Sequence, residues 1–515
     1  MGIFDIFKTK NKESISTISQ KQKSLYEMIS EALVDGELPK DFSLPTEAEN
    51  GIAWMDGAAD GVCIYHMSSM GIGKEEENIM AEALKVVSEG DYQEADRLFA
   101  RLGENVRAIS AIDEFQTYIA EHINELNIEN IYNYAIHAVI ETCDTETVKY
   151  GLVMLGLFKT ENIKEIIHTI GLSDEFSIFA ILNMLKWEDG NNEVFQLAKK
   201  IHGWGRIHAV ERIEPTTDEI KKWMLLEGVH NNVMIGYSAL ECWKKSGAYN
   251  TLMAGPTKDE FTGIRDIING LLDEGPVASI SQIESSDEIL IRFLNVVKEF
   301  ADSIDDYEVV RSIKIHYEDE ENKNAEIESL CEELLISDRC KALAAEAVTK
   351  GWHIDLAREV GVNYKDDVFA VMEADLEHKN HLCLYLMDDP EYMNKVLELF
   401  RRRLVLSELK GNPGTTIGFG MRSWKQRAVQ HVLQELRRYP LEGLDFVEAA
   451  LQSESIRTRN MALATIKSWI KKEGKPLSEF LPDFQVLLSN LREIEPDKMV
   501  KESMSELISG KVDFR

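Results

Sequence analysis

The sequence lacks any apolar run long enough to cross a membrane. A transmembrane helix needs about 20 apolar residues, and the most apolar early window, Gly51–Met70, is interrupted by Asp56 and Asp60. The amino terminus, Met1–Lys8, lacks the basic start and the long apolar core of a signal peptide. We therefore expect a cytoplasmic protein with no transmembrane segment, whose short apolar terminus docks on the body of the fold.

Cysteine is also scarce. The chain has 6 cysteines among 515 residues, far apart and without a Cys-x-x-Cys pair. Disulfide frameworks are typical of small secreted domains. We therefore expect reduced thiols, which agrees with a cytoplasmic location.

Positive charge is in deficit. Against 90 Asp and Glu the chain has 57 Lys and Arg, and its net charge is −33. Such a surface repels the phosphate backbone of nucleic acids and the headgroups of anionic membranes. We expect neither as a partner, and we expect the charge mainly to favour solubility.

Alternation of apolar and polar residues is rare, whereas helical spacing dominates from about residue 76 onward, which argues for helices. Residues 193–245 give the clearest pattern, with four helices expected. The first carries an apolar stripe ending at Gly203, and the second is stopped by Pro215. A capping box of Thr216 and Glu219 opens the third, Gly228 closes it with a left-handed C-cap, and the fourth ends at Gly247. The two stripes are Val194, Leu197, Ala198 and Ile201, then Trp204, Ile207, Val210 and Ile213.

Helical hairpins are expected elsewhere as well. Residues 81–103 predict two helices joined at Gly90, with Ala95 and Phe99 in packing positions that resemble those of tetratricopeptide hairpins. Such pairs cannot bury their apolar faces alone, so they stack. We predict an all-α fold of stacked helical hairpins, a HEAT/TPR-like α-solenoid, with a possible separate C-terminal repeat domain. The expected divisions are residues 1–70, 71–255, 256–412 and 413–515.

Two Glu-x-x-His pairs are the candidate metal ligands. Glu165 with His168, and Glu227 with His230, have the spacing that places both side chains on one helical face. Two such pairs and two further glutamates hold the di-iron centre of ferritin-like bundles. Ordinary surface pairs are the alternative. The glycine-rich residues 411–420 lack the Lys-Ser/Thr of a phosphate-binding loop, so we interpret them as an interdomain loop.

Trp204, Trp223 and Trp243 recur at intervals of about 20 residues. We interpret them as core residues of successive hairpins. If they instead line a shared concave groove, an apolar ligand or a partner helix could bind there.

The run Gly203-Trp204-Gly205-Arg206-Ile207-His208, its continuation through Pro215 to Trp223, and Asn231-Asn232-Val233-Met234 resemble a bacterial family of HEAT-repeat-like proteins. These proteins, from Bacillus- and Clostridium-type organisms, are named limonene hydroxylase. The similarity covers residues 50–280 best, and its motifs are helix–turn patterns without a catalytic signature. It implies a monooxygenase that inserts one oxygen atom at an allylic carbon of limonene, giving carveol- or perillyl alcohol-type products.

That chemistry implies O2, a reduced nicotinamide (NAD(P)H) and an oxygen-activating cofactor such as flavin or iron. The sequence contains no recognisable flavin, haem or nicotinamide motif, so catalytic residues stay unknown and a separate reductase is a further possibility. The residues themselves favour a different function. They predict a non-enzymatic helical-repeat scaffold that binds a protein or peptide partner.

Overall fold

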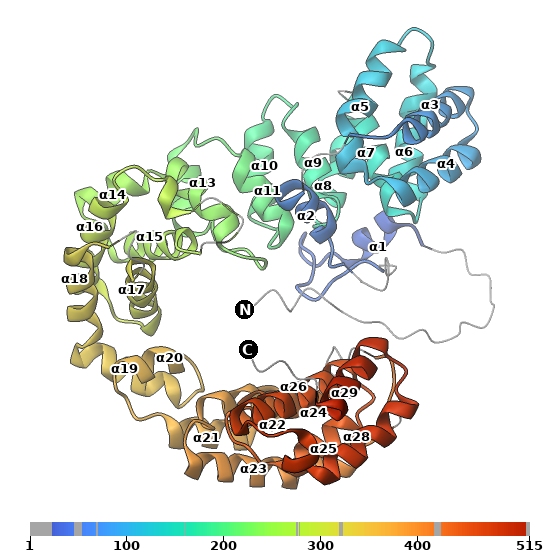
Figure 1. The fold of residues 1–515 in the computed structure, drawn as a ribbon. Coiled ribbons are helices and arrows are strands. Elements are labelled where there is room, and N and C mark those ends of the chain that lie inside the picture. The colour runs from blue at the N-terminus through green and yellow to red at the C-terminus, as the bar shows by residue number, and fades with distance from the viewer. Residues whose placement is uncertain are drawn as a thin grey trace. The chain divides into compact units, whose positions relative to one another are not determined.

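The computed structural model describes residues 23–45, 54–67, 71–158, 160–273, 275, 277, 279–318, 323–411, 413–416 and 424–510. These residues form helices joined by short turns, with two isolated β-bridges and no β-strand among them (Figure 1). The predicted all-α fold class of stacked helical hairpins is confirmed. No helix formed by the described residues combines the length and apolar character needed to cross a bilayer.

The chain divides into two compact units. Unit 1 comprises residues 1–301 and 312–331, and unit 2 comprises residues 302–311 and 332–515. Helices α17 (Ile304–Tyr317) and α18 (Ala325–Leu335) belong in part to each. The predicted divisions at residues 70, 255 and 412 stay predictions.

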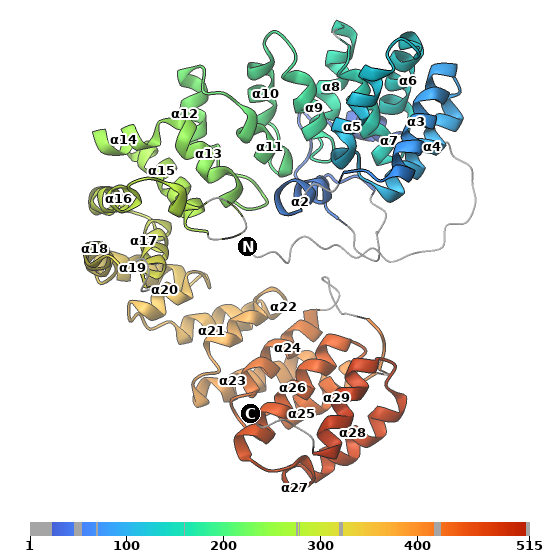
Figure 2. The ribbon, with the colours of Figure 1, turned by 45° about the horizontal axis from the view of Figure 1, so that its top comes forward.

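Unit 1 contains sixteen helices among its described residues, and neighbours in sequence pack as pairs, such as α3 with α4 and α6 with α7 (Figures 1 and 2). They are α1 (Leu25–Ala32), α2 (Ala58–His66), α3 (Lys74–Glu89), α4 (Tyr92–Asn105), α5 (Ala108–Glu121), α6 (Ile128–Glu141), α7 (Thr145–Leu155), α8 (Lys164–Ile170), α9 (Ser177–Met184), α10 (Gly190–Ala198), α11 (Trp204–Arg212), α12 (Asp218–Leu226), α13 (Gly236–Ser246), α14 (Ala248–Ala254), α15 (Lys258–Leu271) and α16 (Ser286–Phe300).

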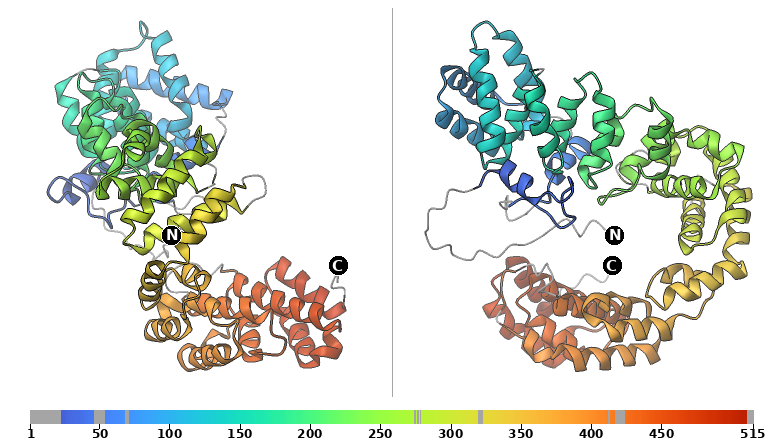
Figure 3. Two further views of the ribbon diagram at one scale, coloured as in Figure 1. Left: turned by 90° about the vertical axis from the view of Figure 1, so that its left-hand side faces the viewer. Right: turned by 180° about the vertical axis from the view of Figure 1, so that it is seen from behind.

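In unit 2, helices α24, α25 and α26 pack on one another, and α29 packs on both α26 and α28. These helices are labelled in Figure 2 and form the dark orange to red part of the ribbon in Figure 3. The helices of this unit's described residues are α19 (Asp338–Val348), α20 (Ile354–Glu359), α21 (Lys365–Ala374), α22 (Leu376–Lys379), α23 (Pro390–Leu404), α24 (Trp424–Leu436), α25 (Leu444–Leu451), α26 (Ile456–Glu473), α27 (Leu477–Phe480), α28 (Pro482–Ile494) and α29 (Lys498–Ser509).

The four helices expected in residues 193–245 are present as α10 to α13. Both predicted apolar stripes are buried. Gly247 has a φ of 79° and ends α13, as its position predicts. The hairpin around Gly90 is confirmed too, because this glycine ends α3 with a φ of 86° and the Asp91 carboxylate caps α4.

Two local predictions in this region are wrong. Thr217, one residue later than predicted, caps α12 by accepting a hydrogen bond from the backbone N–H of Ile220. Gly228 is not among the glycines with positive φ. A Cβ at Gly228 would lie 2.6 Å from Cys242 Sγ and 2.8 Å from the Met224 carbonyl oxygen, so close packing against α13 explains this glycine.

Residues 1–22, which include the apolar terminus expected to dock, lie outside the described residues, as do residues 412 and 417–423 of the glycine-rich loop and its flank.

Candidate functional site

Helix α2 packs against side chains from distant parts of unit 1. It contacts α7, the turn before α9, α11 and α13, and its ribbon lies beside α11 in Figure 2. The helix has only nine residues, and isolated helices shorter than about 12 residues are marginal in water. Its helical form therefore depends on the surface beneath it. We call that surface the α2-binding surface, defined by Lys149, Glu175, Trp204, His208 and Tyr237.

Two glycines allow the backbone of α2 to approach this surface. Gly57, at the N-cap, has a φ of 73°, and a Cβ there would lie 2.5 Å from the Asp174 carbonyl oxygen. A Cβ at Gly61 would lie 2.2 Å from Cε3 of Trp204. Since real Cβ contacts are not this short, the backbone of α2 rests directly on the indole ring. Any larger residue at position 61 must lift the helix from Trp204.

An aromatic cluster holds the C-terminal turn of α2. The Tyr65 ring stacks on Trp204, with centroids 6.0 Å apart, and on His208, with centroids 5.7 Å apart. Its hydroxyl donates a 2.8 Å hydrogen bond to Glu211 Oε2. Tyr237 of α13 contacts the Tyr65 ring and forms a hydrogen bond with His66. Stacked aromatic side chains whose hydroxyl groups form hydrogen bonds are typical anchors of binding interfaces.

A buried ion cluster holds the first turn of α2. The Lys149 ammonium, which is fully buried, lies 2.7 Å from Asp60 Oδ2, 2.7 Å from Glu175 Oε1 and 2.9 Å from Glu146 Oε1. Arg107 Nη1 lies 3.7 Å from both Asp60 Oδ1 and Glu146 Oε1. The cluster thus joins α2, α7, the N-terminus of α5 and the turn before α9.

The carboxylates of this cluster also bond to backbone. Glu175 Oε2 accepts a 2.7 Å hydrogen bond from the Gly57 N–H, and Glu146 Oε2 accepts a 2.6 Å hydrogen bond from the Ala108 N–H. Both N–H groups lie at helix N-termini, where a negative charge is stabilising. The cluster therefore fixes the start of α2 and the start of α5 at the same time.

The charges of the cluster set the protonation of Asp60. Three carboxylates face two cations, so one negative charge is left over when all five groups are ionised. Burial, and the repulsion from Glu146 and Glu175, raise the pKa of Asp60 to about 7 even though Lys149 opposes the change. The same carboxylates raise the pKa of Lys149 well above its usual value, so its ammonium stays charged. A proton on Asp60 makes the cluster neutral.

Asp174 positions Trp204 beneath α2. Its Oδ1 accepts a 2.8 Å hydrogen bond from the Gly205 N–H at the start of α11. A Cβ at Gly203 would lie 2.2 Å from Asp174 Oδ2, and one at Gly205 would lie 2.6 Å from Ser177 Oγ. Burial raises the pKa of Asp174 to about 6. Because both glycines lack a side chain, the first residues of α11 can lie in direct contact with the Asp174 carboxyl group.

His208 is buried and uncharged. Burial, and the positive charge of Arg212, lower its pKa to about 3. Its Nδ1 lies 3.3 Å from the Tyr65 hydroxyl. The neutral imidazole ring stacks on Tyr65 and makes one polar contact with its hydroxyl. No charge is buried in the process.

The four predicted metal ligands lie on two separate parts of unit 1. His168 Nε2 is 3.0 Å from Glu193 Oε2, beside a pocket of about 250 Å³, whereas His230 Nε2 is 2.9 Å from Asp266 Oδ2. Glu165, His168, Glu227 and His230 are all exposed. Nowhere in the described ranges do three or more His, Cys, Asp or Glu side chains gather in a way that could hold a metal ion. The two histidines thus have different acidic partners, and a di-iron centre built from these four residues stays a prediction.

The three regularly spaced tryptophans have different roles. Trp204 is buried under α2, Trp243 is 7% exposed on α13, and Trp223 is partly buried against Phe195 with the Arg206 guanidinium over its ring. Of the three, Trp204 belongs to the α2-binding surface. The alternative interpretation, in which all three tryptophans line one groove, stays a prediction.

The sequence does not identify the residues of the ion cluster as a site. Its one indication is Asp60, an acidic residue inside the apolar window 51–70, because a charged residue in a buried helix requires a partner. Its partners lie more than 40 residues away along the chain, and helical spacing carries no information on such pairs.

The arrangement can bind a short helix by apolar stacking at one end and by charge pairing at the other.

Comparison with known proteins found no matching family model, no similar curated protein and no similar solved structure.

Proposed function

We propose that this chain is a non-enzymatic helical-repeat scaffold that binds a helical segment of a partner protein at the α2-binding surface. The observation that carries the proposal is the docking of α2, a short helix held there by an aromatic cluster and a buried ion cluster. A surface that accommodates a helix of its own chain has the chemistry to accept one from a partner.

The contacts of α2 define the partner. The partner helix needs an acidic residue that pairs with Lys149, followed directly by a glycine that contacts Trp204. Four positions after the glycine it needs an aromatic residue that stacks on His208. Residues Asp60, Gly61 and Tyr65 supply this pattern within the chain. α2 is then the intramolecular competitor, and the partner gains access when α2 leaves.

Capture of the partner tests this proposal. In Gly61→Trp the indole of Trp204 leaves no room for α2, so the surface should be open, whereas Gly61→Trp combined with Trp204→Ala has also lost the anchor. We expect the first variant to capture a defined protein from an extract of the source cells, more than the parent chain does, and the second to lose it. Capture by neither variant, or equally by both, would contradict the proposal, provided that circular dichroism shows intact helices.

The resemblance carried by residues 203–223 supports a second proposal, a limonene monooxygenase. Its test uses the purified full chain, with its visible spectrum, its metal content and NAD(P)H oxidation in the presence of limonene. Carveol- or perillyl alcohol-type products would support the enzyme. A colourless, metal-free protein that yields no oxygenated terpene would remove this proposal and leave the scaffold.

A further inference from the structure

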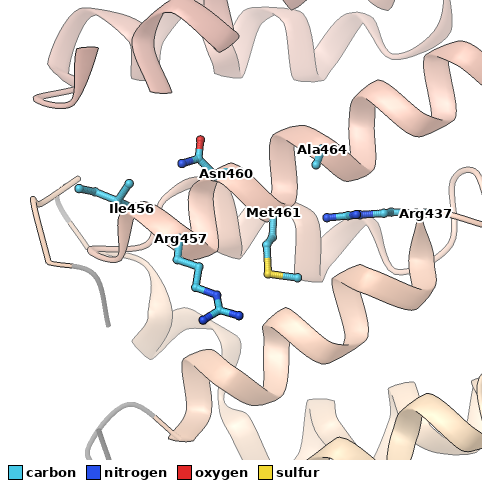
Figure 4. Close-up of a pocket in the computed structure, with 6 residues that line it drawn as sticks. All are labelled: Arg437, Ile456, Arg457, Asn460, Met461 and Ala464. Carbon is cyan, nitrogen blue, oxygen red and sulfur yellow. The ribbon is translucent and has the colours of Figure 1, made fainter. Parts of the chain in front are cut away.

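Unit 2 contains a pocket that the scaffold proposal does not use. It has a volume of about 470 Å³ and lies between the end of α24 and the first half of α26 (Figure 4). Its lining combines three apolar side chains with an amide and two guanidinium groups: Arg437, Ile456, Arg457, Asn460, Met461 and Ala464. In Figure 4 the guanidinium groups of Arg437 and Arg457 flank the Met461 side chain.

Arg437 has a side-chain donor that no other described residue satisfies. It is half-buried, and its Nε atom is buried without a hydrogen-bond partner among the described residues. The acidic residue nearest to it in sequence, Glu435, is paired with Arg438 instead. A buried donor without an acceptor is destabilising, so an acceptor that reaches the Arg437 guanidinium group through the pocket would satisfy a group that the fold leaves without a partner.

The lining of the pocket carries two cations, Arg437 and Arg457, and no carboxylate, although the chain as a whole has a net charge of −33. His431 of α24 responds to this field. Burial first, and then the positive charges of His381, Arg427 and Arg457, lower its pKa to about 4. The potential here therefore favours an anion.

We propose that this pocket binds a small amphipathic monoanion, namely a carboxylate attached to a short aliphatic or aromatic body. Guanidinium groups pair with carboxylates through two hydrogen bonds, and Ile456, Met461 and Ala464 supply the apolar contact for the body. The volume lies within the roughly 300–1,000 Å³ that is usual for small-ligand sites. The net charge of the chain repels a polyanion far more than a monoanion, which argues against an acidic macromolecule.

Isothermal titration of the full chain with octanoate tests the proposal. Octan-1-ol has the apolar body without the charge, and inorganic phosphate has charge without the body. We expect octanoate to bind better than either one. Arg437→Gln and Arg457→Gln should each weaken octanoate binding by at least about tenfold, since a hydrogen bond to a charged group is worth about 1.5–3 kcal/mol and about 1.4 kcal/mol is a factor of ten. Ala464→Phe should abolish binding by filling the pocket.

The matched control is Arg402→Gln, which changes an exposed arginine of the same unit that pairs with Glu373, and its octanoate affinity should equal that of the parent. Circular dichroism and the denaturation midpoint of each variant separate a lost site from a lost fold. Equal binding of octanol and octanoate, equal binding of phosphate, or unchanged affinity in a folded Arg437→Gln variant would each overturn the proposal.

Discussion

At the scale of single residues, unit 1 depends on a lysine that water does not reach. Lys149 pairs with Asp60, Glu146 and Glu175, and its removal leaves one buried and two largely buried carboxylates with one cation near them. Removing one partner of a buried ion pair lowers the free energy of unfolding by far more than the intact pair contributes to it, because the remaining charge is buried without compensation. The cluster therefore makes the position of α2 highly specific.

Replacement of Lys149 by Met should lower the free energy of unfolding of unit 1 by about 3–5 kcal/mol. Chemical denaturation followed by circular dichroism measures the change. Lys85→Met is the control, since Lys85 is 76% exposed and its loss should change stability by less than about 1 kcal/mol. A cost for Lys149→Met as small as that of the control would show that the cluster is not needed for folding.

The raised pKa of Asp60 predicts a pH dependence with a definite sign. The unfolded carboxyl ionises near pH 4, whereas the folded one keeps its proton up to about pH 7. Between these values the folded state binds more protons, so the free energy of unfolding falls as pH rises. Asp60→Asn removes this effect, so the stability of the parent relative to the variant should fall by roughly 2 kcal/mol between pH 5 and pH 8.

Urea denaturation of both proteins at the two pH values measures this difference. Other titrating groups, including Asp174 and His208, are common to both chains and cancel in the comparison. A parent that gains stability relative to Asp60→Asn as pH rises would show that Asp60 is ionised in the folded state.

At the scale of elements, the sequence predicts helices and their buried faces well but not where a helix docks. The stripe Val194 to Ile201 is buried as expected, because a 3.6-residue period reports one face of a helix. The position of α2 depends instead on pairs such as Tyr65 with His208, which are 143 residues apart. Gly61, Gly203 and Gly205 are required by these packed contacts, and no local turn pattern identifies such a requirement.

Gly61→Ala should loosen α2, because even one methyl group would lie 2.2 Å from the Trp204 ring. Amide hydrogen exchange of residues 58–66 should become at least tenfold faster, while that of α6 and α7 changes little. Gly247→Ala is the comparison, since a Cβ there meets no atom within 4 Å although its φ of 79° is strained. If exchange in α2 stayed at the parent rate, the close contact with Trp204 would not be holding the helix.

At the scale of the whole molecule, the two units have separate buried ion pairs. In unit 2, Arg459 and Glu495 are fully buried and 2.7 Å apart, and Arg459 also donates hydrogen bonds to the carbonyl oxygens of Ser453 and Gly414. Because the units are compact by themselves, each should unfold in its own transition.

Calorimetry of single variants tests this independence. Glu495→Gln should lower the midpoint temperature of unfolding of unit 2 alone by several degrees. Lys149→Met should lower that of unit 1 alone by a similar amount. A single transition that both substitutions shift equally would show that the units unfold together.

Fluorescence anisotropy of a labelled peptide of residues 54–67 tests directly whether the α2-binding surface recognises a helix. The peptide should bind Gly61→Trp with micromolar affinity, and the parent chain at least tenfold more weakly because α2 competes at a high effective concentration. The same peptide carrying Asp60→Lys should not bind, since its ammonium would face Lys149. No binding to a folded Gly61→Trp variant, or equal binding of both peptides, would contradict the claim that this surface recognises a helix.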